Sequence, residues 1–256
     1  MFLSIDAGNS NIVFGFFDAK EQKWDPVLRM ETQRGMEFNY LKKNMSLFFL
    51  ESSISPSDIS SVGISSVVPE INENLRKAVR AYLHQDAFFI TERSYKPMAV
   101  TTKKPAEMGT DLMANAVAAY DYYGSDCIVV DFGTALTFTV IDHSGEILGV
   151  TIAPGLKTAI KSLFTNTSKL PEVRLELPDS AIGKDTVHSI QAGILYGYTG
   201  LVRGMLETIR KELPQDFKVV ATGGLSKILT NLQGEFDLID NNLTLKGIKL
   251  ITEQNN

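Results

Sequence analysis

The sequence predicts an α/β protein built from two similar halves, each a mixed sheet flanked by helices. Strand-like apolar runs alternate with amphipathic helical stretches along the whole chain. A strand, a glycine-containing polar turn and a second strand occur at residues 2–17 and again at residues 128–141, which places Asp6 and Asp131 at corresponding positions. The 256-residue length exceeds one domain of ~150 residues, so that two small halves fit.

The first half begins with a predicted hairpin of two strands, at residues 2–6 and 12–17. Amphipathic spacing predicts two helices, and β-type runs and breakers predict the strands around them. The remaining elements are helices at 36–51 and 70–84, strands at 61–68 and 87–90, an irregular segment at 93–108, and a helix opened by Gly109-Thr110-Asp111 and ending near Gly124. We place the domain boundary in this helix and expect domains at 1–118 and 119–256.

The second half repeats the strand-turn-strand opening and then continues with further strands and helices. Its predicted elements are strands at 128–131, 136–141, 147–152 and 218–222, a turn at 153–155, helices at 156–164 and 186–213, a helix after Gly223-Gly224, and a final segment at 243–251. The long helix carries glycines at 193, 197, 200 and 204. Glycine costs a helix up to ~1 kcal/mol relative to alanine. The spacing therefore predicts that something, most simply a neighbouring helix, packs close to its backbone.

The composition excludes several classes of function. With 25 basic and 30 acidic residues the net charge is −5, and no five basic residues follow one another, which argues against a nucleic-acid partner. No apolar run reaches the ~18 residues of a membrane helix, and the N-terminus lacks the pattern of a signal peptide. The single cysteine, Cys127, and three scattered histidines predict no disulfide and no zinc site. We expect a cytoplasmic location without a membrane partner.

The first turn, Asp6-Ala7-Gly8-Asn9-Ser10, has the composition of an anion-binding loop. Gly8 permits a backbone that presents amide N–H groups to a phosphate, and the Asp6 carboxylate can hold a hard cation such as Mg²⁺. The same residue types are common in ordinary hairpins, so a structural role remains open. The second copy, Asp131-Phe132-Gly133-Thr134, favours two turns that face each other across a cleft and hold one polyphosphate.

Three other turns allow both a structural and a functional interpretation. Asp111 could cap the helix that it opens. Gly223-Gly224 could be a tight turn or could let a base or ribose lie against the backbone, and Ala153-Pro154-Gly155 has the same two interpretations. The motifs G-x-x-x-x-G-K-[ST] and G-x-S-x-G are absent from the sequence, which excludes a P-loop and the nucleophile turn of a serine hydrolase.

Taken in chain order, these motifs resemble those of the type III pantothenate kinases, members of the acetate and sugar kinase/Hsp70/actin superfamily. The matching stretches are Asp6 to Ser10, Ser65-Ser66-Val67-Val68-Pro69, Gly109-Thr110-Asp111 with Ala114-Asn115-Ala116, Asp131 to Ala135, Ile152 to Gly155, Ile182-Gly183-Lys184-Asp185-Thr186, Gln191-Ala192-Gly193, Gly197-Tyr198, Gly223-Gly224 and Leu243 to Gly247. The resemblance covers the full length and implies two ribonuclease H-like (actin-like ATPase) domains.

The resemblance also implies an activity and a set of site residues. The activity is transfer of the γ-phosphoryl group of ATP to pantothenate, which yields 4'-phosphopantothenate in the first step of coenzyme A biosynthesis, by a homodimer that uses Mg²⁺ and K⁺ or NH₄⁺. By this analogy Asp111 is the catalytic base, Asp6 serves Mg²⁺ and the phosphates, and Asp131 holds the monovalent cation. Gly8, Asn9, Ser10, Gly133 and Thr134 line the phosphates, Gly223 and Gly224 lie near the nucleoside, and Gly109, Thr110, Asp111 and Thr186 contact pantothenate.

The sequence departs from the family pattern where an anionic substrate would be held. The family's Gly-Ala-Asp-Arg is Gly109-Thr110-Asp111-Leu112 here, and Leu136 replaces a threonine. Leucine cannot make a charge-assisted hydrogen bond, which contributes about 1.5–3 kcal/mol. Two alternatives therefore stay open: a catalytically impaired relative with a ligand-binding or regulatory role, and a kinase for another small hydroxyl compound. A basic residue elsewhere, such as Lys103, Lys104 or Lys157, could compensate for the arginine.

Overall fold

The computed structural model describes residues 1–124, 126–224 and 229–256, which form two compact units. The first unit contains residues 1–123, 144–146 and 242–256, and the second contains residues 124–143 and 147–241. The sequence predicts a division between residues 118 and 119. Contacts within the chain group residues 119–123 and 242–256 with the first unit, because the helix that crosses residue 118 continues to residue 123 and because the last helix packs on the first sheet.

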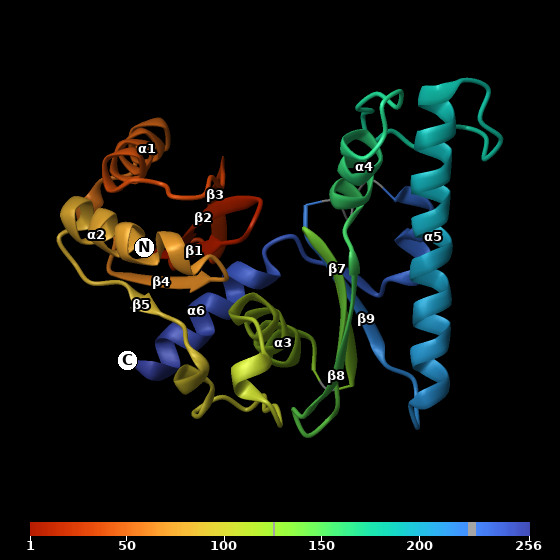
Figure 1. Cartoon of the computed structure of the whole chain (residues 1–256). Helices are drawn as coiled ribbons and strands as arrows, with labels where there is room; N and C mark the ends of the chain where they lie inside the picture. The colour runs from red at the N-terminus through yellow and green to blue at the C-terminus, as the bar shows by residue number, and fades with distance from the viewer. Residues whose placement is uncertain (125, 225–228) are drawn as a thin grey trace. The chain divides into compact units, whose positions relative to one another are not determined.

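The first unit is built on a five-stranded mixed sheet in the order β3-β2-β1-β4-β5 (Figure 1). Its strands are β1 (Phe2–Ala7), β2 (Asn11–Asp18), β3 (Lys23–Glu31), β4 (Ser61–Ser66) and β5 (Phe88–Phe89). Neighbouring pairs β1–β2 and β2–β3 are antiparallel, whereas β4 pairs in parallel with β1 and with β5. The predicted strands of this half are confirmed, and β3 is a further strand that the sequence pattern did not predict.

One face of the first sheet carries the larger apolar side chains and is covered by α1 (Phe38–Glu51) and α2 (Pro69–Leu83). Leu41, Met45 and Phe49 recur at four-residue spacing on α1 and are buried, as a helix with one apolar face requires. The edge-to-face ring pair of Phe16 and Phe49 lies in this core, with ring centroids 5.1 Å apart. Burying an aromatic or leucine side chain stabilises the fold by about 1.5–3 kcal/mol.

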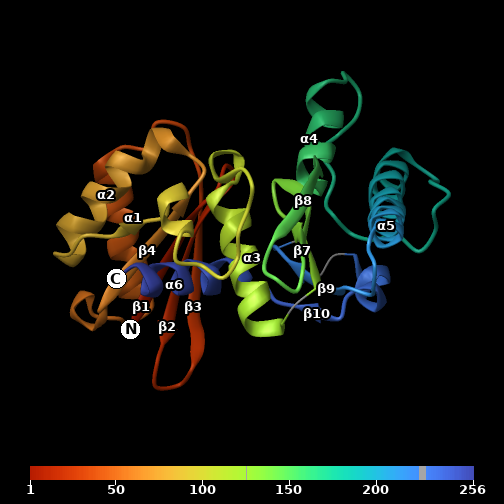
Figure 2. The same cartoon turned by 90° about the horizontal axis from the view of Figure 1, so that it is seen from below.

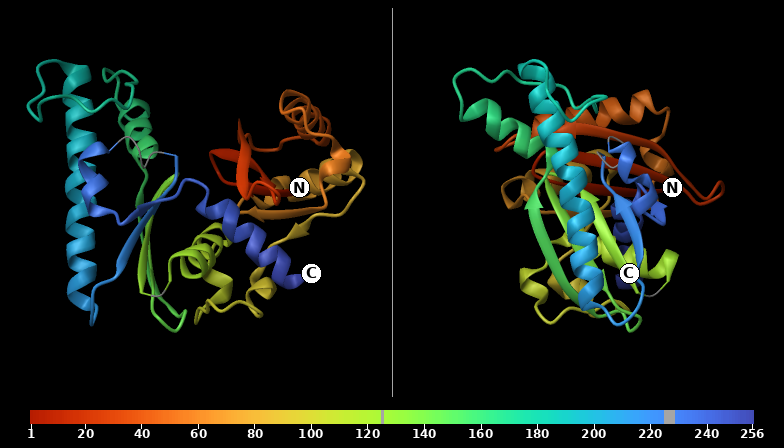
Figure 3. Two further views of the ribbon diagram at one scale, coloured as in Figure 1. Left: turned by 180° about the vertical axis from the view of Figure 1, so that it is seen from behind. Right: turned by 90° about the vertical axis from the view of Figure 1, so that its right-hand side faces the viewer.

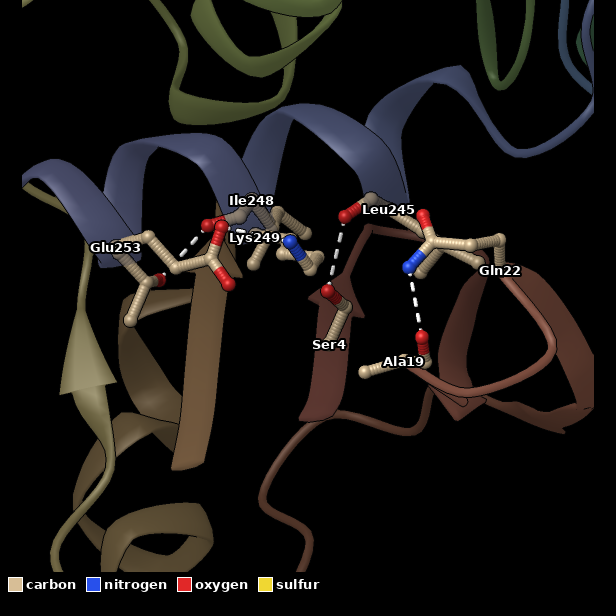
Figure 4. A network of polar contacts seen from close by, with 8 residues as sticks. Ser4, Ala19, Gln22, Leu245, Ile248, Lys249 and Glu253 are labelled. Carbon is tan, nitrogen blue, oxygen red and sulfur yellow. Dashed lines mark hydrogen bonds and ion pairs between the residues drawn. The ribbon is translucent and has the colours of Figure 1, made fainter. Parts of the chain in front are cut away.

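The opposite face of the first sheet, which includes Ser4, Gly15 and Gly63, is covered by α3 (Thr110–Tyr123) and α6 (Leu243–Asn255), which lie side by side (Figure 2). A methyl group built on Gly15 would lie 2.5 Å from the end of the Leu245 side chain, so glycine at this position of β2 leaves room for Leu245 of α6. The Ser4 hydroxyl donates to the carbonyl oxygen of Leu245 at 2.9 Å (Figure 4). The last helix of the chain is therefore part of the first unit.

The second unit repeats the topology of the first in a five-stranded sheet of order β10-β9-β6-β7-β8. Its strands are β6 (Cys127–Phe132), β7 (Ala135–Ile141), β8 (Ile147–Pro154), β9 (Lys218–Thr222) and β10 (Leu238–Ile239). Strands β6, β7 and β8 are antiparallel neighbours, and β9 pairs in parallel with β6 and β10. Strand for strand this is the arrangement of the first sheet, and the predicted internal repeat is confirmed.

Two helices pack against one face of the second sheet: α4 (Leu156–Thr165) and the 27-residue α5 (Thr186–Glu212) (Figure 3). Phe138 and Val202 are fully buried in the core between sheet and helix, and Cys127 is a buried free thiol, as expected. The four α5 glycines are exposed, and a methyl group built on each meets no atom within 4 Å. Within the described chain, the predicted close neighbour of these glycines is therefore wrong.

Two further observations complete the fold. The helix predicted after Gly223-Gly224 falls partly on residues 225–228, outside the described residues, and residues 230–235 form a 3₁₀ helix. Within the described ranges, no helix is both long enough and apolar enough to cross a membrane.

Candidate active site

Asp6 and Ser65 lie next to each other at the C-terminal ends of two parallel strands. They are register partners on β1 and β4, and both side chains are on the sheet face that α3 and α6 cover, because alternate residues of a strand point to the same face. Ser65 is fully buried, with 0% of its surface exposed, while Asp6 is only partly buried. The carboxyl ends of parallel strands are where ligands bind in open α/β sheets.

Helix α3 begins beside these two strand ends. The Thr110 hydroxyl lies 2.8 Å from the Ser65 hydroxyl and donates a longer bond, 3.4 Å, to the carbonyl oxygen of Ser66. Asp111 follows within the first turn of α3, and its Oδ1 accepts the backbone N–H of Leu112 at 2.8 Å. Burial raises the pKa of the Asp111 carboxyl above its usual value, and the Leu112 N–H opposes this in part. Asp111 therefore lies inside the helix and does not precede it as a cap.

The first turn forms a compact loop whose peptides are held by hydrogen bonds. The N–H of Gly8 donates to the Asn11 carbonyl at 3.0 Å. Thr32, directly after β3, donates its hydroxyl to the Gly8 carbonyl at 2.7 Å and its N–H to the Ser10 carbonyl at 3.0 Å. Asn9 and Ser10 are exposed at the tip. This geometry suits a loop that presents its remaining amides to an anion.

The second unit contains a corresponding loop after β6. The Gly133 N–H donates to the Ala135 carbonyl at 3.1 Å. The Thr134 carbonyl accepts both the Gly155 N–H, at 3.0 Å, and the Thr158 hydroxyl, at 2.7 Å. In both units, a threonine that follows the third strand of the sheet in the chain donates its hydroxyl to a carbonyl oxygen of the loop. Gly155 follows β8, so Ala153 and Pro154 end a strand and the predicted turn begins later.

Gly223 is packed against Asp131 on the neighbouring strand end. Its φ of +90° belongs to the region that favours glycine. A methyl group built on it would lie 2.6 Å from the Asp131 carboxylate and 2.7 Å from the Phe132 carbonyl oxygen. Gly223 therefore packs so closely against the Asp131 carboxylate and the Phe132 carbonyl that any side chain at this position would collide with them. Gly224 adjoins this position in a turn.

Thr186 lies elsewhere in the second unit, in the first turn of α5. An open hollow of about 630 Å³ adjoins it. The lining residues are Leu163, Leu170, Gly183, Lys184, Asp185, Thr186, Ser189, Ile190, Gly193 and Ile194. Asp185 is the N-cap of α5, and its carboxylate accepts the His188 N–H at 2.8 Å. Thr186 is therefore accessible to a ligand that enters the hollow.

The lysines considered as substitutes for the missing arginine are distributed over both units. In the first unit, Lys103 pairs with Glu146 at 2.9 Å and Lys104 with Glu107 at 3.0 Å. Both lysine side chains are exposed, and such surface pairs contribute only ~0–1 kcal/mol. Lys157 is exposed on α4 in the second unit. No described ion pair thus ties any of the three to Asp111.

Three residues near the site were not singled out by sequence reasoning. Thr32 and Ser65 act through the hydroxyl bonds described above. Tyr95, buried in the 3₁₀ turn Glu92–Tyr95, donates its hydroxyl to the Met108 carbonyl at 3.4 Å. Burial, with a smaller effect of the Asp111 carboxylate, raises the pKa of Tyr95 to about 12. Only Ser65 gave a sequence signal, as part of the Ser65-to-Pro69 motif.

Comparison with known sequences identifies the family of the chain. The family model described as type III pantothenate kinase matches residues 2–208. A type III pantothenate kinase from Desulforapulum autotrophicum is 41% identical over 257 residues, covering 99% of this chain and 97% of that protein. The enzyme of the same name from Myxococcus xanthus is 38% identical over 256 residues, covering 100% of this chain and 99% of that protein.

Solved structures with low sequence identity share the fold. The activator of 2-hydroxyisocaproyl-CoA dehydratase from Clostridium difficile matches with a TM-score of 0.56 at 9% identity, covering 99% of this chain and 95% of that one. A ROK family glucokinase from Streptomyces griseus matches with a TM-score of 0.53 at 11% identity, covering 98% and 99%. The predicted fold class, two ribonuclease H-like domains that are each a mixed sheet flanked by helices, is confirmed.

Proposed function

Because the chain belongs to the type III pantothenate kinase family, we propose that it transfers the γ-phosphoryl group of ATP to the primary hydroxyl of pantothenate with Asp111 as the catalytic base. The observation that carries this proposal is the position and burial of Asp111. Its carboxylate is held at the start of α3 by the Leu112 N–H, and burial raises its pKa. A base with a raised pKa accepts a proton more readily near neutral pH.

In the proposed reaction the Asp111 carboxylate takes the proton of the pantothenate hydroxyl. The hydroxyl oxygen forms a bond to the γ-phosphorus of ATP, the bond from that phosphorus to the bridging oxygen breaks, and ADP leaves. Phosphoryl transfer depends mainly on positioning and on charge stabilisation. We assign positioning of pantothenate to Gly109, Thr110 and Thr186. The Thr110 hydroxyl faces β4, so this residue would contact substrate through its backbone.

We assign the phosphates of ATP to the two loops, Gly8 to Ser10 and Gly133-Thr134, and the nucleoside to Gly223-Gly224. Hydrogen bonds that hold the loop carbonyls support this assignment, because they order the loops before ATP arrives. Asp6 would hold Mg²⁺, which neutralises phosphate charge. No cluster of three or more metal-ligating side chains occurs among the described residues. One carboxylate nevertheless fits Mg²⁺, which is often bound by one or two carboxylates together with substrate phosphates and water.

We assign the monovalent cation, K⁺ or NH₄⁺, to Asp131. The Asp131 carboxylate and the Phe132 carbonyl oxygen both lie close to Gly223 and therefore near each other, which supports this assignment. Carboxylate and carbonyl oxygens are the ligands that hard cations prefer. A side chain at position 223 would push these two oxygens out of place, so Gly223→Ala should weaken activation by K⁺.

We also propose that the protein works as a homodimer. The support is the line of four exposed glycines on α5, where a methyl group built on each glycine meets no atom of the described chain within 4 Å. Each exposed helical glycine costs up to ~1 kcal/mol, so four of them on one side of a helix are explained if a second copy packs there.

A coupled assay of ADP release tests the proposed reaction. The protein is incubated with ATP, Mg²⁺ and K⁺ or NH₄⁺, with and without pantothenate, and the product is identified by mass. We expect pantothenate-dependent ADP release that requires Mg²⁺ and is stimulated by the monovalent cation. Equal ADP release with and without pantothenate, under every cation condition, would contradict the proposal.

Leu112 supports a second candidate, a relative that binds ligands with little turnover. Two of the lysines considered as substitutes for the arginine, Lys103 and Lys104, are instead paired with Glu146 and Glu107. Calorimetry with pantothenate on the wild-type protein and on Leu112→Arg separates the two candidates. Tighter binding by Leu112→Arg, together with turnover in both forms, supports the kinase. Binding without turnover in both forms supports the second candidate.

A further inference from the structure

The Ser65–Thr110 hydroxyl pair joins the end of β4 to the start of α3. Ser65 Oγ and Thr110 Oγ1 are 2.8 Å apart, and Ser65 is fully buried. A hydroxyl has one proton to donate and two lone pairs to accept. Thr110 can therefore donate to the Ser66 carbonyl while it accepts from Ser65.

The segment on the β4 side of this pair is itself held firmly. The Ser66 hydroxyl donates to Asn72 Oδ1 on α2 at 2.5 Å and accepts the Val68 N–H at 3.2 Å. Val67 donates its N–H to the Ala7 carbonyl at 3.0 Å, which ties the same turn to the end of β1. The two residues that follow Ser65 thus anchor the end of β4 to α2 and to the strand that carries Asp6.

We propose that the Ser65–Thr110 pair is a positioning device that fixes the Asp111 carboxylate relative to Asp6. The chain of contacts is short: Asp6 is the register partner of Ser65, Ser65 is bonded to Thr110, and Asp111 follows Thr110 in the first turn of α3. The inference rests on the proposed function, in which Asp6 serves the phosphates and Asp111 is the base. Reacting groups must be aligned closely for phosphoryl transfer, and a shift of about 1 Å can cost roughly 100-fold in rate.

Thr110→Val tests the pair because valine keeps the shape of threonine but cannot bond to Ser65. The variant loses the link and leaves the buried Ser65 hydroxyl without this partner. We expect kcat to fall about 10- to 100-fold, with the KM for ATP unchanged because the phosphate loop is untouched. Thr110→Ser, which keeps the hydroxyl, should retain most of the wild-type kcat. Ser65→Ala should match Thr110→Val, and the double variant should be no slower than either.

Thr244→Val is the matched control for loosening α3. The Thr244 hydroxyl of α6 donates to Asn115 Oδ1 on α3 at 2.7 Å, away from the start of the helix. This variant also loses one hydroxyl bond to α3, and we expect a lower melting temperature with kcat unchanged. If Thr244→Val lowers kcat as much as Thr110→Val does, the pair has only a structural role and the inference is overturned.

Two other outcomes are equally informative. A wild-type kcat in Thr110→Val, in an active enzyme, overturns the positioning inference and leaves the proposed function intact. If the wild-type protein shows no pantothenate-dependent turnover while it is folded, the proposed function fails and the inference fails with it. A kcat that falls in Thr110→Val and is restored in Thr110→Ser supports both.

Discussion

Burial opposes ionisation of the Asp111 carboxyl, whereas the proposed reaction needs this carboxyl in its ionised form. Its pKa is raised in the folded protein by burial, so the folded state binds a proton more tightly than the unfolded state does. As the pH rises from the usual Asp pKa through the raised pKa, the contribution of Asp111 to the free energy of unfolding therefore becomes unfavourable. At neutral pH the ionised carboxylate destabilises the fold, and its presence is explained by the base role proposed for it.

Asp111→Asn should therefore change activity and stability in opposite directions. Without the base we expect kcat to fall by about 10²–10⁴-fold, while the melting temperature at pH 8 rises. Steady-state assays and thermal unfolding check the two effects. The control is Asp121→Asn, an exposed position on the same helix, which should change neither. A variant that retains turnover would show that Asp111 is not the base.

The same raised pKa sets the pH dependence of turnover. Because only the ionised carboxylate accepts a proton, kcat should fall as the pH drops through the raised pKa of Asp111 in the enzyme-substrate complex. The acid limb of a kcat profile should lie above the usual Asp pKa of about 3.9. Thr110→Val should lower kcat at every pH without removing this limb, since the base is still present. An acid limb at or below the usual pKa would contradict the effect of burial.

Thr32 controls the orientation of a single peptide in the first loop. Its hydroxyl holds the Gly8 carbonyl at 2.7 Å, and in a trans peptide the next N–H, that of Asn9, points to the opposite side. Thr32→Val removes this bond, so we expect the KM for ATP to rise roughly 2- to 10-fold, the equivalent of one neutral hydrogen bond. The KM for pantothenate should stay the same, and Thr32→Ser should restore the KM for ATP. An unchanged KM for ATP in the valine variant would contradict the role.

Helix α6 lies at the C-terminal end of the chain, yet it packs in the first unit and completes it. Gly247 faces the backbone of Ala114 on α3 so closely that a side chain there would collide with it. We expect Gly247→Ala to lower the free energy of unfolding by about 1–3 kcal/mol or more, because the added methyl group overpacks the contact between α6 and α3. Gly149→Ala, in β8 where a methyl group meets no atom within 4 Å, should change it by less than about 0.5 kcal/mol. Denaturant unfolding of both variants tests this, and equal stabilities would contradict the close packing.

The sequence predicted most elements because their apolar spacing is strong and local. The helices that became α1 and α2 bury side chains at helical spacing, and the strands that became β1 and β6 end in the same acid-containing turn. Strand β3 was missed because Pro26 interrupts the strand-like pattern and only one of its nine residues is buried, as an edge strand allows. The packing of α6 in the first unit and the bond from Thr32 to Gly8 depend on tertiary contacts, which no local pattern encodes.

At the scale of the whole molecule, the repeat explains how two loops of one kind arise. Strands β1 to β5 correspond one by one to β6 to β10, and Asp6 and Asp131 occupy the same position on β1 and β6. Their surroundings differ, because Asp6 is paired with Ser65 on β4, whereas Asp131 is paired with Thr222 and lies against Gly223. One topology therefore offers two different carboxylate environments, consistent with the different cations proposed for them. That the two loops face each other remains a prediction.

The proposed homodimer gives α5 a test in which two effects have opposite signs. Gly200 is exposed in the middle of α5, and replacing it with leucine should stabilise an isolated helix by up to about 1 kcal/mol. If a second copy packs on the glycine line, the same side chain prevents its close approach. We therefore expect Gly200→Leu to weaken dimerisation at least tenfold in sedimentation equilibrium, while the monomer unfolds at a higher temperature.

A matched substitution on another side of α5 separates packing from helix propensity. Arg210 is exposed and lies away from the glycine line, since successive residues of a helix are rotated by about 100°. Arg210→Leu introduces the same apolar side chain, and the dimer should retain its wild-type affinity. If Gly200→Leu dimerises as tightly as wild type, α5 is not the dimer surface. In that case Gly200 faces solvent in the native protein, and packing does not explain the four glycines of α5.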